Sequence, residues 1–122
     1  MNIDEKAHQT IAKLLHMTVK GEIDWSRFTD TRLLTYGTDD VVQVGYKTAL
    51  ADNYFAIYEV RYQTMDDGEN VYWNDRIVLK IIDVEGMPVW EFPNSPQLRA
   101  LLSKVQAQAA GVESKLDKIL KL

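Results

Sequence analysis

The stretch that decides the fold is YWNDRIVLKII, residues 72–82, where apolar and polar side chains alternate as in a half-buried β-strand. One side of this strand carries a single aspartate among apolar residues: Trp73, Asp75, Ile77, Leu79 and Ile81. Because an unpaired buried carboxylate is costly, Asp75 needs partners or water. We expect it near the strand entry, in a bulge or a frayed end, bonded to a tyrosine hydroxyl or a backbone amide.

Three further runs of residues read as strands, at residues 41–50, 54–63 and 88–92. The connections ADN, TMDDGEN and DVEGM are short, and they are polar or contain glycine, which is typical of hairpin turns. The sequence therefore predicts a four-stranded antiparallel meander.

The register of the two central strands follows from placing both apolar sides on the core. The side of residues 54–63 chosen for the core is Tyr54, Ala56, Tyr58, Val60 and Tyr62. The expected cross-strand pairs are Tyr62 with Trp73, Val60 with Asp75, Tyr58 with Ile77, and Ala56 with Leu79. This register also sets Glu59 opposite Arg76, an attractive cross-strand pair.

Helices are expected at both ends of the chain. Residues 4–20 place a stripe at helical spacing, made of Ala7, Ile11, Leu14, Leu15 and Thr18. After Pro96 the chain returns to helix, with Leu98, Leu101, Leu102, Val105 and Ala109 on one face. Gly111 favours a break and a short last helix, although Val112, Leu116 and Ile119 continue the phase and one long helix over residues 96–121 stays open.

Two segments between the first helix and the strands are less regular. GEIDWSRF, residues 21–28, is expected to be a loop that gathers Ile23, Trp25 and Phe28 and covers one edge of the core. Residues 29–40 are expected to be irregular, with RLLTY as a possible short strand.

The predicted fold is a single α+β domain over residues 1–122, with the order α-β-β-β-β-α-α. One N-terminal helix and one or two C-terminal helices should cover one face of the sheet. The other face should be open and polar, and should carry Glu59, Arg61, Arg76 and Lys80.

Composition and charge limit the function classes. The net charge of −4 disfavours nucleic acid and anionic membrane as partners, and the absence of cysteine excludes thiolate catalysis and cysteine zinc sites. Residues 39–91 hold 4 basic and 11 acidic side chains, a surface that would suit a basic partner, whereas residues 95–122 hold 5 basic and 2 acidic. No signal peptide or long apolar run is visible, so a cytoplasmic location is expected.

No motif indicates a catalytic, cofactor or metal site. DDGEN, residues 66–70, does not fit a calcium loop, because Gln63, Met65 and Asn74 occupy ligand positions, and a hairpin turn is predicted instead. His8 and His16 are eight residues apart, which is not the spacing of a helical metal pair. Nucleophile-elbow and phosphate-loop patterns are absent.

One candidate ligand site remains. If Asp75 lies in a pocket at the sheet end, Trp73, Tyr58 and Tyr62 would form its walls, and such a site would suit a cation or a polyol. A buried acid that takes part in catalysis is a further alternative. The three tryptophans and six tyrosines are mainly core residues at strand spacing, and any that are exposed would mark a protein interface.

The order GEIDW, YKTAL, a tyrosine-rich hairpin and VWEFPNSPQLRALLSKVQAQAAGV resembles a group of small bacterial proteins of unassigned function. The resemblance covers most of the chain after residue 14 and implies a compact α+β fold and a bacterial or phage origin. It carries over no catalytic residue and no cofactor.

The function predicted from the sequence is a non-enzymatic protein-interaction module of accessory, regulatory or immunity type. Its partner would be another protein, with a basic surface complementary to the acidic sheet region. The alternative is a small-ligand binder built on the aromatic and acidic pocket. The sequence leaves the oligomeric state open.

Overall fold

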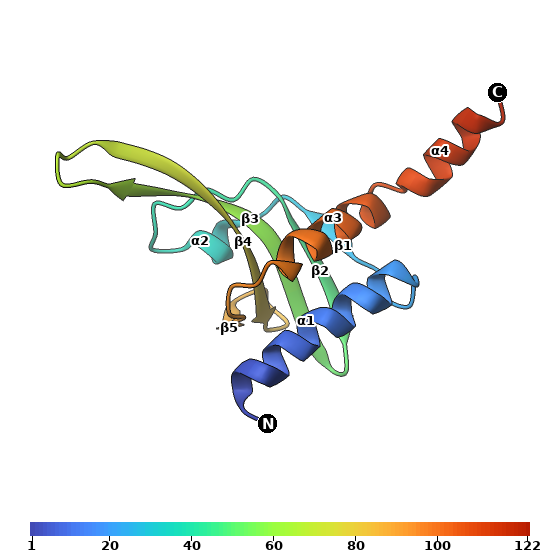
Figure 1. The fold of residues 1–122 in the computed structure, drawn as a ribbon, viewed down its shortest axis with the longest axis horizontal. Helices are drawn as coiled ribbons and strands as arrows, with labels where there is room; N and C mark the ends of the chain where they lie inside the picture. The colour runs from blue at the N-terminus through green and yellow to red at the C-terminus, as the bar shows by residue number, and fades with distance from the viewer.

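The computed structural model describes residues 1–122 as a layer of helices on a five-stranded antiparallel sheet (Figure 1). The strands follow one another in the order β1-β2-β3-β4-β5. The elements are α1 (Ile3–Val19), β1 (Ser26–Phe28), α2 (Arg32–Thr35), β2 (Gly45–Leu50), β3 (Asn53–Met65), β4 (Val71–Ile82), β5 (Pro88–Glu91), α3 (Gln97–Ala109) and α4 (Val112–Leu120). The α+β class and the antiparallel meander are confirmed.

The first helix forms where its capping chemistry and apolar stripe predict it. The Asn2 side chain accepts a hydrogen bond from the Glu5 amide at 2.8 Å, and Gly21 ends the helix with a left-handed φ of 71°. Its buried side chains are Ala7, Ile11, Leu14 and Thr18. They face α3, whose buried side chains are Leu98, Leu101, Leu102 and Val105, as expected.

The loop between α1 and β1 is held to both long helices. The Trp25 indole donates to the Thr18 hydroxyl at 2.9 Å, and the Trp25 amide donates to the Gln108 side chain at 2.8 Å. Ile23 and Trp25 are buried in the core beneath α1 and α3, so the expected covering of the core is confirmed for these two residues. Phe28 is not part of that cluster and packs on the opposite side of the sheet.

Both faces of the sheet are covered. The face toward α1 and α3, called here the helix face, contributes Tyr46, Phe55, Ile57, Ile77, Leu79 and Phe92 to the larger core. The opposite face, called the α2 face, carries a smaller cluster made of Val42, Ala56, Tyr58, Val60, Val78 and Ile82. Phe28 and Leu34 pack against this smaller cluster from the segment that contains α2.

The predicted register of β3 and β4 is wrong by one residue. The observed pairs are Tyr62 with Asn74, Val60 with Arg76, Tyr58 with Val78 and Ala56 with Lys80. The face chosen for β4 is correct, since Ile77 and Leu79 point to the helices, but the face chosen for β3 is not. Phe55 and Ile57 fill the helix face instead, and a shift of one residue exchanges the two faces of a strand.

The predicted open polar face is also wrong. Glu59 and Arg61 lie on the helix face, where Glu59 pairs with Arg99 of α3 at 3.4 Å rather than with Arg76. Arg76 and Lys80 lie on the α2 face, where both pair with Glu91 of β5, at 3.0 Å and 3.8 Å. The segment before β2 covers the face that was expected to face solvent.

Smaller differences concern the segment before β2 and the C-terminus. Residues 26–28 add a fifth strand where a loop was expected, and RLLT forms a helical turn rather than a strand. Gly111 has a left-handed φ of 63°, so the predicted break is correct and α4 is a separate short helix. Val112, Leu116 and Ile119, which continue the apolar phase of α3, are exposed because α4 extends away from the body (Figure 1).

Candidate functional site

The far part of the β3–β4 hairpin extends beyond the rest of the sheet (Figure 1). β3 and β4 have 13 and 12 residues, whereas β2 has 6 and β5 has 4. The last contact of a third strand-like segment is the bridge between Val41 and Arg61. Residues 61–75, called here the hairpin end, therefore form mostly a two-stranded ribbon, in which no residue is fully buried.

The turn at the tip is rigidified by one carboxylate. Asp66 accepts hydrogen bonds from the amides of Gly68 and Asn70, both at 2.9 Å, and from the Tyr72 hydroxyl at 3.1 Å. The bond from the Asn70 amide contributes most to holding the pKa of Asp66 below its ordinary value. The predicted hairpin turn at DDGEN is confirmed, and the Asp66 side chain stabilises this turn.

The helix face of the hairpin end carries an uncovered apolar patch. Its members are Met65, Val71 and Trp73, whose exposed fractions are 66%, 50% and 48%. Met65 is the register partner of Val71, and Gln63 is the partner of Trp73, so these side chains line one surface. Arg61 lies over the Trp73 ring, with its guanidinium carbon 5.4 Å from the ring centroid.

Asp75 lies at the base of this patch, on the surface. Its side chain is 53% exposed, and its carboxylate pairs with Arg61, its cross-strand partner, at 3.4 Å. Neither a tyrosine hydroxyl nor a backbone amide donates to it, in contrast to the expectation. The aspartate interrupts the apolar line because the helices cover β4 only from Ile77 onward.

The predicted pocket is not assembled. Trp73 and Asp75 lie on the helix face of the ribbon, whereas Tyr58 and Tyr62 lie on the α2 face. Lys80 and Arg76 lie over the rings of Tyr58 and Tyr62, with distances to the centroids of 5.9 Å in both cases. The four residues therefore cannot line one cavity.

Tyr58 is the most perturbed titratable group of the sheet. Its ring is buried in the smaller cluster, and its hydroxyl has no hydrogen-bond partner. Burial raises the pKa of the Tyr58 hydroxyl well above its ordinary value, and the Glu91 carboxylate adds to the shift. Tyr58 does not line the groove on the α2 face described below, so we assign it a packing role.

A groove of about 780 Å³ lies on the α2 face, beside α2 and the turn between β4 and β5. Phe28, Lys47 and Tyr54 line it, with the Lys47 ammonium 5.6 Å from the Phe28 ring centroid. Its charged lining residues are Asp24, Asp30, Asp83, Glu85, Arg32 and Lys47. This groove was not predicted from the sequence, because α2 was not expected to form.

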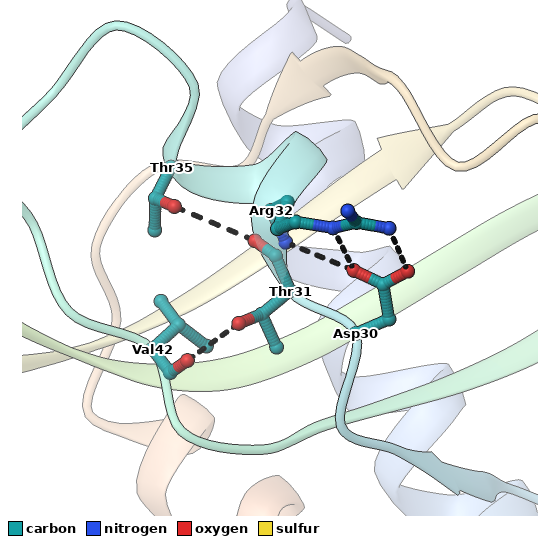
Figure 2. Close-up of polar contacts among 5 residues, drawn as sticks. All are labelled: Asp30, Thr31, Arg32, Thr35 and Val42. Carbon is teal, nitrogen blue, oxygen red and sulfur yellow. Dashed lines mark hydrogen bonds and ion pairs between the residues drawn. The ribbon is translucent and has the colours of Figure 1, made fainter.

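The wall of the groove is fixed by short polar contacts (Figure 2). The Arg32 guanidinium donates two hydrogen bonds to the Asp30 carboxylate, each 2.9 Å long, and lowers the pKa of Asp30 (Figure 2). The Thr31 hydroxyl donates to the Val42 carbonyl at 2.6 Å, which ties α2 to the segment before β2 (Figure 2).

No group of three or more histidine, aspartate or glutamate side chains is placed to hold a metal ion. His8 and His16 are exposed on α1. None of the helices is both long enough and apolar enough to cross a membrane.

Comparison of the chain with protein-family models, with curated proteins and with solved structures finds no match. The resemblance to small bacterial proteins stays a prediction. The hairpin end and the groove are the two surfaces of the molecule that could carry a function.

Proposed function

We propose that the protein is a non-enzymatic protein-interaction module whose contact surface is the helix face of the hairpin end. The observation that supports this best is the exposed Trp73, flanked by Met65 and Val71 on a ribbon that nothing in the chain covers. Tryptophan, methionine and arginine are enriched at protein interfaces, and a buried tryptophan is a frequent hot spot.

The charges around this patch favour a basic partner. Residues 64–75 contain four acidic side chains, Asp66, Asp67, Glu69 and Asp75, and no basic one. Such a rim would speed encounter with a positively charged surface and disfavour acidic partners. A partner with an apolar ridge flanked by lysine or arginine fits this surface.

Paired variants on one strand test this proposal. Trp73 and the adjacent Tyr72 are similarly exposed, at 48% and 52%, but they project from opposite faces of the ribbon. Immobilised wild type, Trp73→Ser and Tyr72→Ser proteins would be exposed to host lysate, and retained proteins identified by mass spectrometry. We expect a set retained by wild type and Tyr72→Ser that Trp73→Ser loses. The same set on all three proteins would contradict the proposal.

A second candidate function, small-ligand binding, is favoured by the groove on the α2 face. Asp24 and Glu85 line it without an ion-pair partner, beside the rings of Phe28 and Tyr54, a combination suited to an organic cation. A thermal-shift screen of cationic metabolites would test it, since a ligand raises the melting temperature by mass action. A specific ligand should lose its effect in Tyr54→Ala and keep it in the exposed control Tyr36→Ala. A screen without such a ligand would leave the hairpin end as the better candidate.

A further inference from the structure

α4 is a second surface of this chain that has no partner. No residue of α4 is buried, although Val112, Leu116, Ile119 and Leu120 share one side of the helix. The left-handed Gly111 turns the helix away from the body (Figure 1), and none of these side chains belongs to either core cluster. A helix of nine residues is too short to be stable in water by propensity alone, which favours its packing on another surface.

α4 is compatible in charge and length with the hairpin end. It carries two basic and two acidic side chains, Lys115 and Lys118 against Glu113 and Asp117, so it is not repelled by the hairpin end, which beyond Gln63 is purely acidic. Of the two lysines, Lys115 lies beside the apolar side of the helix and Lys118 lies on the opposite side. The lengths also agree. Nine helical residues span about 13 Å, and the strand from Val71 to Asp75 spans about 14 Å.

Within one molecule the two surfaces do not meet. In Figure 1 α4 and the hairpin end extend from opposite ends of the molecule, and both extend toward the same side, away from the N-terminus. A twofold axis perpendicular to this view, placed on the side toward which both extend, would bring α4 of each copy onto the hairpin end of the other. On the helix face, a docked helix would continue the layer that α1 and α3 already form on the sheet.

We propose that two copies of this chain form a reciprocal dimer in which α4 of each copy packs on Met65, Val71 and Trp73 of the other. This inference rests on the proposed function and names the partner of the hairpin end. Reciprocity matters because one nine-residue helix buries too little area for a stable complex, and a twofold arrangement doubles it.

The oligomeric state of the full chain, measured by sedimentation velocity over a range of concentrations, is the first test. The variants are Leu116→Asp on α4 and Trp73→Asp on the hairpin end, called here the arm variants. Val84→Asp is the control, because Val84 is exposed but lies on neither α4 nor the hairpin end. Circular dichroism would check that each variant is folded. We expect wild type and Val84→Asp to dimerise, and each arm variant to weaken the dimer by at least about tenfold.

Mixing the two arm variants is the decisive experiment. A heterodimer of Leu116→Asp with Trp73→Asp would contain one intact contact, between the unchanged α4 of one copy and the unchanged hairpin end of the other. We therefore expect more dimer in the mixture than in either variant alone. A dimer held by pairs of α4 helices, or by pairs of hairpins, would show no such recovery and would overturn the inference.

Other outcomes separate this inference from the proposed function. A wild type that stays monomeric overturns the reciprocal dimer, and if Trp73 is still needed to retain a host protein, the proposed function stands without it. A monomer that binds anionic phospholipid vesicles through Leu116 also overturns the dimer and assigns α4 to a membrane surface. A dimer that neither arm variant weakens overturns the inference as well.

Discussion

The two ends of the β3–β4 ribbon share one antiparallel register but differ in what covers them. At the body end, residues 55–60 and 76–82, four consecutive residues from Phe55 to Tyr58 are buried, because α1 and α3 cover one face and the α2 segment covers the other. At the hairpin end, residues 61–75, no residue is fully buried. The same strands therefore supply the core at one end and a surface for recognition at the other.

The largest contrast in stability should come from removing one aliphatic side chain at each end. Leu79 is fully buried opposite Ile57, so Leu79→Ala should lower the free energy of unfolding by about 2–5 kcal/mol. Val71→Ala at the hairpin end should change it by less than about 0.5 kcal/mol. Urea denaturation of both variants would measure the difference, and equal losses would show that the hairpin end is covered in solution.

The next effect concerns Gly45 of β2 and Gly68 at the hairpin tip, the two glycines whose φ lies outside the left-handed region. A Cβ atom on Gly45 would meet the ring of Phe28, which lies directly against this glycine and would have to shift. Gly45→Ala should therefore destabilise the protein by about 1–3 kcal/mol. At the hairpin tip, a Cβ on Gly68 would meet only the Asn70 side chain, at 3.3 Å, so Gly68→Ala is the milder control. A Gly45→Ala protein as stable as wild type would mean that the Phe28 ring moves aside into the adjacent groove at no cost.

The buried Tyr58 hydroxyl predicts a pH dependence of the body end. Burial raises its pKa above the ordinary 10.0, so above that pH the unfolded chain releases a proton that the folded protein keeps. Stability should then fall with rising pH, with a contribution from Tyr58 of about 1.4 kcal/mol per pH unit.

The Tyr58→Phe variant isolates this contribution. Because the hydroxyl has no hydrogen-bond partner, the variant should equal wild type at pH 7 or exceed it by about 1 kcal/mol. Its advantage should grow above pH 10.0 in thermal unfolding, since it lacks the titrating group. A constant difference at all pH values would mean that the hydroxyl is hydrated in the folded state.

The smallest effect is expected at Asp75. Its ion pair with Arg61 is about half exposed on both sides, and such pairs contribute about 0–1 kcal/mol. Asp75→Asn should therefore change the free energy of unfolding by less than about 0.5 kcal/mol. The change should be measured at low salt and at about 0.5 M salt, where screening should remove most of the contribution of the ion pair. A clear gain in stability with loss of association would mean that Asp75 serves binding at a cost to the stability of the free protein.

Much of the local structure could be predicted because neighbouring residues control it. The Asn2 cap, the glycines at 21 and 111, and the DDGEN turn act through hydrogen bonds and backbone angles within a few residues. The apolar stripes of α1 and α3 repeat at helical spacing and bury as expected. The side of β4 that faces the helices could also be predicted, because Ile77 and Leu79 alternate with polar or smaller neighbours.

The candidate surfaces and the face of β3 were decided by tertiary structure. Residues 55–58 are apolar on both sides of the strand, so the sequence pattern does not show which side faces the helices. Both sides are buried only because the segment that contains α2 docks on the second face, through the hydrogen bond from Thr31 to Val42. Nothing in the sequence of α4 or of the hairpin end marks them as uncovered, since their apolar patterns equal those of buried elements. Burial is a property of what lies opposite a side chain, and here the covering segments come from distant parts of the chain.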